Sequence, residues 1–253
     1  MIHKLNATIR WKDIQQLVRA GNIKRYYSVD DQVIVNYNNR AMVWDIVAID
    51  VATPADITKT HSMTLMAHYL LDGYMMFDNN EPTNSDSDRR RYGNNRYKDS
   101  NIRLWLNSDG TAGSWWTAQH SADAAPNYAT TKAGFMNGFD ADFLEVIGET
   151  KIKVVKPSVD GGGYEELVDK FYLPSTTEVG LGNENNIAEG ALFPYFDSDA
   201  KRIKNQNIAW VWILRTPHSE YSGFSWAVNN KGSKVSASLW YSAPNVVPAC
   251  NII

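Results

Sequence analysis

Residues 210–217 read Trp-Val-Trp-Ile-Leu-Arg-Thr-Pro, and residues 245–253 read Asn-Val-Val-Pro-Ala-Cys-Asn-Ile-Ile. Each is a short apolar run with the composition of a buried β-strand. The segment between them is rich in serine, asparagine, tyrosine and tryptophan. In binding loops of that composition, rigid aromatic rings supply contact area and small polar groups supply adaptable hydrogen bonds. This end of the chain therefore predicts strands that fold into the core and a segment between them that binds.

The residues expected to contact a ligand all lie between the two apolar runs. Tyr221, Trp240 and Tyr241 adjoin predicted turns, so we expect them to be the exposed anchors. Trp226 and Ser225 alternate along a predicted strand and should face opposite sides of a sheet, so not every aromatic ring can be exposed. The candidate ligand-binding residues are His218, Ser219, Tyr221, Ser222, Ser225, Asn229, Ser236, Ser238, Trp240, Tyr241, Ser242 and Asn245.

Composition indicates a globular chain and excludes several classes of partner. The 253 residues are 43% apolar and 12% aromatic, which is enough for a large core in one domain or two. Because 25 basic residues nearly balance 28 acidic ones, no global field attracts nucleic acid or an anionic membrane. No long apolar run and no apolar signal-peptide centre are present. We expect no nucleic-acid partner, no membrane insertion and no export by the general secretory route.

Motifs that mark common enzymes are absent: the P-loop, the dinucleotide fingerprint, the zinc-binding His-Glu-x-x-His and the Gly-x-Ser-x-Gly elbow. The single cysteine, Cys250, excludes an internal disulfide, and its apolar neighbours predict a buried, inert thiol. His61 and His68 would face opposite sides of a strand. We therefore expect no catalytic residue, no cofactor and no metal. Structural calcium stays an alternative at two aspartate pairs, Asp140 with Asp142 and Asp197 with Asp199.

The first third of the chain predicts a helix followed by antiparallel strands. Thr8 can cap a helix that Gly21 ends. A hairpin follows, with strands at 33–35 and 42–51 joined through Asn38-Asn39, and a further strand is expected at 62–71. The apolar face of the helix consists of Trp11, Ile14, Leu17 and Val18.

The rest of the chain predicts loops, two short helices and more antiparallel strands. Residues 78–100 are polar and aperiodic, so we expect a surface insertion with solvated arginines. Ser100 and Asp140 can each cap a helix. Residues 151–155 and 170–173 are expected to pair as a hairpin. Further strands are predicted at 209–214, 225–228, 235–239 and 246–252.

No linker and no internal repeat divides the sequence, which favours one domain over residues 1–253. We expect a loop-rich α+β fold with antiparallel sheets and two or three helices. An N-terminal helix and hairpin would occupy about residues 8–51, and the loop insertion about residues 78–100.

Several motifs follow one another in a fixed order: Trp-Asp-Ile-Val at 44–47, His-Ser-Met-Thr-Leu at 61–65, Ser-Asn-Ile-Arg-Leu-Trp-Leu-Asn at 100–107, Gly-Phe-Met-Asn-Gly at 134–138, Lys-Phe-Tyr-Leu-Pro-Ser-Thr-Thr-Glu-Val at 170–179, Trp-Ile-Leu-Arg-Thr-Pro at 212–217 and Val-Val-Pro-Ala-Cys at 246–250. Together they resemble a family of uncharacterised domains from gut bacteria and their phages, over about residues 10–253. The resemblance implies a fold like those of C-type lectins and formylglycine-generating enzymes. Members are similar to the variable proteins of diversity-generating retroelements, which carry replaceable residues in a C-terminal segment.

The resemblance implies binding and not catalysis. Lectins of this fold bind sugar through calcium with Glu-Pro-Asn and Trp-Asn-Asp motifs, whereas residues 81–84 read Glu-Pro-Thr-Asn and no Trp-Asn-Asp occurs. Formylglycine-generating enzymes need reactive cysteines, which Cys250 alone does not supply. We expect a non-enzymatic phage or prophage adhesin, for instance of a tail fibre, that recognises a bacterial surface protein or glycan during host attachment. The alternative is a structural virion or decoration protein whose aromatic surface makes subunit contacts.

These interpretations carry expectations about assembly and location. Other virion proteins are expected as partners, and a homo-oligomer such as a trimer is consistent with the resemblance. The expected location is the virion, or the cytoplasm before assembly.

Overall fold

The computed structural model describes residues 2–3, 10–71, 75–205, 210–239 and 245–253, and over these residues the fold is mixed α+β. The helices are α1 (Trp11–Arg19), η1 (Ile23–Arg25), α2 (Ser87–Tyr92), η2 (Tyr97–Asp99), α3 (Asn101–Leu106), η3 (Phe135–Gly138), α4 (Ala141–Leu144), η4 (Ser158–Asp160) and α5 (Asp199–Arg202), where η marks a 3₁₀-helix. The strands are β1 (Ile2–His3), β2 (Gln32–Tyr37), β3 (Arg40–Ile49), β4 (Thr53–Pro54), β5 (Met63–Ala67), β6 (Thr150–Val155), β7 (Tyr164–Asp169), β8 (Phe171–Tyr172), β9 (Trp212–Pro217), β10 (Phe224–Val228), β11 (Lys234–Ser238) and β12 (Ala249–Ile252).

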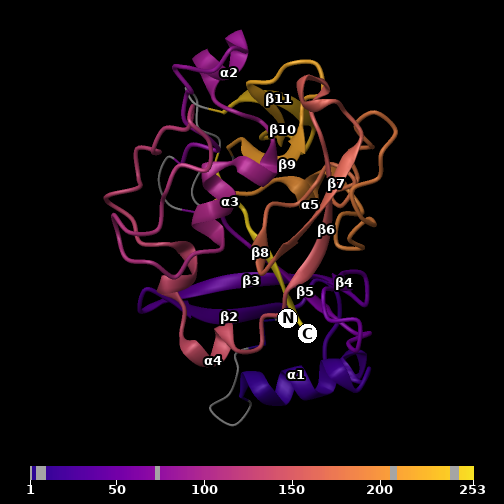
Figure 1. Ribbon diagram of the computed structural model, residues 1–253. Coiled ribbons are helices and arrows are strands. Elements are labelled where there is room, and N and C mark those ends of the chain that lie inside the picture. The colour runs from indigo at the N-terminus through magenta and orange to yellow at the C-terminus, as the bar shows by residue number, and fades with distance from the viewer. Residues whose placement is uncertain (1, 4–9, 72–74, 206–209, 240–244) are drawn as a thin grey trace.

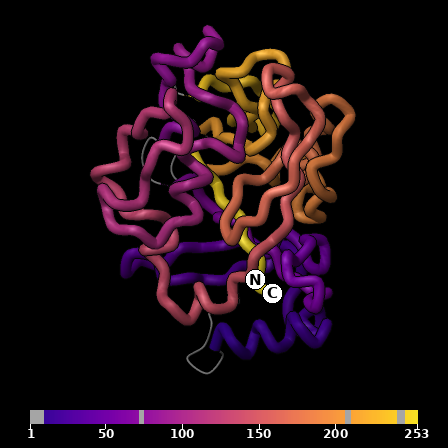
Figure 2. Tube along the Cα trace, viewed as in Figure 1, coloured from indigo at the N-terminus to yellow at the C-terminus, as the bar shows by residue number. Residues whose placement is uncertain are grey.

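Three sheets, almost entirely antiparallel, organise these elements. The largest has the strand order β1-β2-β3-β5-β12-β8, and the two smaller ones have the orders β11-β10-β9 and β4-β6-β7. In Figure 1, α1 lies below β2 and β3, while β9, β10, β11 and α2 lie at the opposite end of the molecule. Figure 2 shows the same path, with the C-terminal segment running from the upper region down to the large sheet. The expected α+β class is confirmed, with more short helices than the two or three predicted.

The C-terminal strand β12 lies inside the large sheet. It pairs antiparallel with β5 on one side and with β8 on the other, so that Cys250 lies between Leu65 and Phe171. All residues from 246 to 253 are buried. Burial raises the pKa of the Cys250 thiol well above its ordinary value. The predicted interior strand and the buried thiol are both confirmed.

The N-terminal helix and the hairpin also agree with the sequence. Asn38 and Asn39, at the turn between β2 and β3, both have positive φ angles of 50° and 60°, as a two-residue hairpin turn requires. Helix α1 buries its apolar face and ends at Arg19, and Gly21, whose φ is +67°, follows the C-cap residue Ala20. At its start, the Asp13 carboxylate accepts a hydrogen bond from the Arg10 backbone N–H. The expected cap Thr8 lies outside the described residues.

The predicted pairing of residues 151–155 with 170–173 is wrong. β6 pairs with β7, which follows directly after the glycine turn, whereas β8 pairs with β12 in the large sheet. The sequence did not indicate β7 as a strand because two of its inward-facing residues, Glu165 and Asp169, are acidic. Their charges are balanced by arginines that come from a distant part of the chain.

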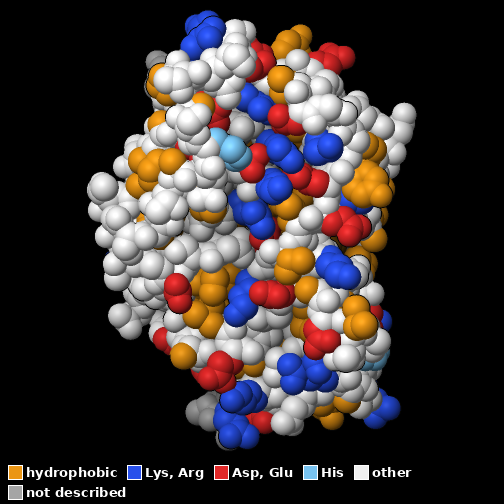
Figure 3. All heavy atoms as spheres, viewed as in Figure 1, with side chains coloured by type: hydrophobic (Ala, Val, Ile, Leu, Met, Phe, Trp, Pro, Cys, Tyr) orange, Lys and Arg blue, Asp and Glu red, His pale blue; other side chains and the backbone are white. Residues whose placement is uncertain are grey.

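The expectation of a surface insertion with solvated arginines at residues 78–100 also needs correction, because the segment packs against the rest of the fold. It contains α2 and η2, and the side chain of Arg89 is only 9% exposed. Bidentate contacts between guanidinium and carboxylate groups are among the stronger polar contacts in proteins. Figure 3 shows basic and acidic side chains interleaved over this face, near α3 and β7. The ion pairs that attach the segment and α3 to the β6–β7 hairpin are Arg89–Asp160, Arg96–Glu165 and Arg103–Asp169.

A buried ionic network surrounds the side chain of Arg215 in β9. The guanidinium of Arg215 donates to both carboxylate oxygens of Glu178, at 2.6 and 2.8 Å, and to the backbone carbonyl of Glu189, at 2.6 Å. The Glu189 carboxylate accepts from the Val155 N–H at 2.9 Å and from the Thr216 hydroxyl. Burial raises the pKa of Glu189 to about 7, although the positive charge of Arg215 opposes this effect. Folding therefore raises the pKa of Glu189 from 4.5 to about 7, and the stability of the protein can be measured across this pH range.

We expect the free energy of unfolding to fall as the pH rises from 4.5 to about 7. In this window the folded chain holds a proton on Glu189 that the unfolded chain has lost, because the ordinary pKa is 4.5 and the folded one about 7. The resulting loss is about 3 kcal/mol. Glu189→Gln should flatten this part of the profile and raise the melting temperature at pH 8, and thermal unfolding between pH 4 and pH 8 measures both. The exposed Glu166→Gln is the control, and equal slopes in both variants would contradict the assignment.

Candidate ligand-binding surface

The described part of the expected binding segment forms a row of rings together with Tyr92 of α2, and we call this row the aromatic surface: Tyr92, His218, Tyr221, Phe224 and Trp226. Ring centroids lie 5.2 Å apart for Tyr92 and Phe224, 6.3 Å for Phe224 and Tyr221, and 4.7 Å for Tyr221 and His218. His218 stacks on Trp226, also at 4.7 Å. Tyr221 is 53% exposed, and the other four are partly buried. Four rings of the row are therefore packed against their neighbours, and the ring of Tyr221 projects into solvent.

A cation lies at each end of the row. The ammonium of Lys234, on β11, is 4.2 Å from the centroid of Trp226, and the guanidinium of Arg91, on α2, is 4.9 Å from that of Tyr92. Cations at such distances are attracted to ring faces and limit how the rings can turn. The surface can thus offer a ligand ring faces, ring edges and positive charge together.

Glu184 fixes the Trp226 end of the row from behind. Its carboxylate accepts hydrogen bonds from the Ser219 backbone N–H at 3.0 Å, the Ser219 hydroxyl at 2.6 Å and the Trp226 indole N–H at 2.7 Å. Burial alone would raise the pKa of Glu184, but the hydrogen bonds from Ser219 and Trp226 lower it below the ordinary value. The group is therefore ionised at neutral pH and accepts all three bonds.

Asn95 holds the turn on which Tyr221 stands. This residue is fully buried, and its side-chain amide lies within 3.0 Å of three backbone carbonyls, those of His218, Tyr221 and Phe224. Its own N–H donates to the Ser222 carbonyl at 3.0 Å. The Asn95 side chain thus supplies hydrogen bonds to backbone carbonyls of the turn between β9 and β10.

Helix α2 packs directly against the same turn. Asp86 caps the helix by accepting from the Asp88 and Arg89 N–H groups, and it also accepts from the Ser222 hydroxyl at 2.5 Å. Gly223 permits the close approach, because a Cβ placed there would lie 2.7 Å from the Cβ of Tyr92. The sequence contains no local signal that α2 and Tyr92 belong to this surface, since the contact spans more than a hundred residues.

The structure divides the twelve candidate residues into four groups. Tyr221 and Ser236 are exposed, as expected. Those only partly exposed are His218, Asn229, Ser238 and Asn245. Three serines are buried, which corrects the expectation that they face a ligand: Ser219, Ser222 and Ser225. Those outside the described residues are Trp240, Tyr241 and Ser242.

The corrected serines have a physical reason to be buried. The Ser219 hydroxyl donates to Glu184 and the Ser222 hydroxyl to Asp86, so both hydroxyls tie the turn to its neighbours. Ser225 lies on the inner face of β10 with Ala227. The hydroxyls of Ser219 and Ser222 therefore hold the turn in place, and the amino-acid composition of the segment does not distinguish this role from ligand contact.

Two further observations concern metals and membranes. Among the described residues, no group of three or more His, Cys, Asp or Glu side chains is arranged to hold a metal ion. His61 and His68 instead contact single aspartates, Asp50 at 3.0 Å and Asp45 at 2.7 Å. Within the same described ranges, no helix combines the length and apolar character needed to cross a bilayer.

One protein family matches the chain. The family model described as a domain of unknown function (DUF6273) covers residues 61–253, which includes every residue of the aromatic surface. No curated protein and no solved structure matches the chain. Function must therefore be argued from the surface itself.

Proposed function

We propose, on the premise that the chain belongs to the DUF6273 family, that it is a non-enzymatic binding module which holds a bacterial surface protein or glycan on the aromatic surface. The observation that carries the proposal is the row of packed rings that ends in the exposed Tyr221. Rings fixed in advance lose little conformational entropy when a ligand binds, so such a surface gains affinity from its rigidity.

The finer proposal is a C-type-lectin-like fold that serves as a phage or prophage virion adhesin for host attachment. It is supported by the ordered motifs that resemble such domains. It is also supported by the contrast between the buried strand β12 and the aromatic surface carried by β10 and the turn before it. In this proposal, exposed positions such as Ser236 tolerate replacement while the core strands keep the fold. A reverse transcriptase gene beside an imperfect repeat of the 3′ coding end would identify such replaceable codons.

Tyr221→Ala is the direct test of the surface. We expect binding to host cells or to an arrayed glycan to weaken by about 1–3 kcal/mol, the usual effect of removing an aromatic anchor. The melting temperature should change little because more than half of this side chain is exposed. Tyr26→Ala is a matched control, since Tyr26 is 60% exposed and follows η1, away from the aromatic surface.

The same variant separates adhesin from structural protein. Unchanged attachment together with failed assembly into particles would make the aromatic surface a subunit contact, and the structural virion role would then replace the adhesin role. Weaker attachment by intact, assembled particles supports the adhesin.

A further inference from the structure

A cavity of about 670 Å³ lies between the end of the β2–β3 hairpin, the segment after β5, helix α3 and the loop that contains η3. Its volume is within the range of pockets that enclose small molecules, roughly 300–1,000 Å³. The elements that surround it are separate from α2 and β9–β11, which carry the aromatic surface (Figure 1). The cavity is therefore separate from the aromatic surface and independent of the proposed function.

Apolar side chains line one part of the cavity. Leu70, Met75 and Trp105 are each less than 8% exposed, and Met42 and Leu71 pack beside them. The Trp105 indole N–H donates to the Ala133 carbonyl at 2.8 Å, which satisfies the one polar group of that ring. Methionine side chains adapt their shape to a guest more readily than branched ones. This part of the cavity thus suits an aromatic or aliphatic body.

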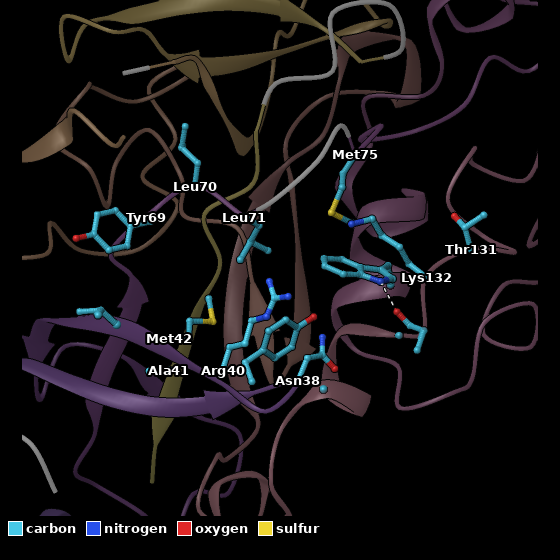
Figure 4. A pocket seen from close by; sticks show the side chains of 16 residues that line it. Asn38, Arg40, Ala41, Met42, Tyr69, Leu70, Leu71, Met75, Thr131 and Lys132 are labelled. Atoms are coloured by element: carbon cyan, nitrogen blue, oxygen red, sulfur yellow. Dashed lines mark hydrogen bonds between the residues drawn. The ribbon is translucent and has the colours of Figure 1, made fainter. Parts of the chain in front are cut away.

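The rim carries positive charge and neutral polar groups. Arg40 is exposed, and in Figure 4 its side chain extends into the cavity beside Leu71. Among the described residues, this side chain has no hydrogen-bond or ion-pair partner. No Asp or Glu is found among the described lining residues, whose only basic members are Arg40 and Lys132. Burial raises the pKa of Tyr37, at the base of the hairpin turn, to about 12, so its hydroxyl adds no negative charge.

We propose that this cavity binds a small anionic molecule with an aromatic or aliphatic body, whose acidic group pairs with Arg40 at the rim. A guanidinium that has no partner within the described part of the chain can form a charge-assisted, bidentate bond with a carboxylate, sulfonate or phosphate group. The apolar body then fills the space over Trp105. A cavity with an apolar part and one cation that has no partner among the described residues favours this combination, since neither a purely polar anion nor a neutral hydrocarbon uses both features.

Two dyes that differ in one acidic group test the proposal: 8-anilinonaphthalene-1-sulfonate and its uncharged parent, N-phenyl-1-naphthylamine. We expect both to bind with enhanced fluorescence, and the sulfonate to bind more tightly. Arg40→Glu should weaken the sulfonate about tenfold or more and leave the neutral dye within about twofold, because only the former loses its ion pair. Arg25→Glu, at another exposed arginine, is the control for net charge.

Three outcomes would overturn the site. They are the absence of binding of both dyes, an unchanged sulfonate affinity in Arg40→Glu, or equal losses for the two dyes. A fourth comes from Tyr221→Ala, which should leave both affinities unchanged. If it removes dye binding, the dyes sit on the aromatic surface and the cavity is not the site. Should Arg40→Glu lower the melting temperature, Arg40→Gln removes the charge without reversing it and is measured in the same way.

Discussion

A chain that ends at Asn245 should show no cooperative thermal transition. The eight residues removed are all buried, and β12 connects β5 to β8 in the large sheet, so its loss exposes two interior strand edges. Full burial of each valine or isoleucine contributes about 1.5–3 kcal/mol. Val246, Val247 and Ile252 alone therefore approach the 5–15 kcal/mol or so by which a typical domain is stable.

Circular dichroism during heating measures this effect, with Ile252→Val as the control. That substitution removes one methylene from the same strand and should cost only about 1 kcal/mol, with the transition still cooperative. A truncated chain that melts at the wild-type temperature would show that β12 is not part of the cooperative core.

Elements with local signals were predictable from the sequence. The β2–β3 hairpin has its turn residues Asn38 and Asn39 between two apolar runs, and both residues adopt the positive φ that such a turn needs. Helix α1 shows a clear apolar period, and β12 shows a continuous apolar run with the buried Cys250. In each case the residues that determine the element lie within it, so neighbouring sequence was enough.

Elements stabilised by distant charges were not predictable. β7 places Glu165 and Asp169 toward the protein, where Arg96 and Arg103 neutralise them from more than sixty residues away. A single sequence does not indicate which arginine meets which carboxylate, so it does not predict a strand at residues 164–169. The same long-range pairing made the segment before α3 look like a solvated insertion.

The sequence predicted where the candidate site lies, but not which residues hold its rings in place. Tyr221 is exposed, as its place beside a turn indicated, but Tyr92 enters the row from α2. Ser225 shows the limit of composition, since a serine in a polar segment was expected to face solvent and is instead buried. Whether a side chain contacts a ligand or holds the site in place depends on the residues it packs against, and these residues come from other parts of the chain.

Replacing Asn95 by alanine should disorganise the aromatic surface and abolish binding to the ligand of Tyr221. The substitution removes the amide that lies within 3.0 Å of three carbonyls, and the His218 carbonyl then has no hydrogen bond from any other described group. A buried carbonyl without a partner costs about 1–3 kcal/mol, and the lost packing adds to this. Asn95→Asp should cost more, because a carboxylate would then face carbonyl oxygens in a fully buried position.

The control for Asn95 is Asn137→Ala, because the Asn137 amide donates to only one carbonyl, that of Asp109 at 2.7 Å, near the surface. Its removal should cost about 1 kcal/mol or less. Thermal unfolding compares the stabilities, hydrogen exchange reports the amides of residues 218–224, and the attachment assay reports binding. If Asn95→Ala melted like Asn137→Ala and kept both protected amides and attachment, the turn would hold its shape without Asn95. The rigidity on which the proposed function depends would then have to come from Glu184 and the stacked rings alone.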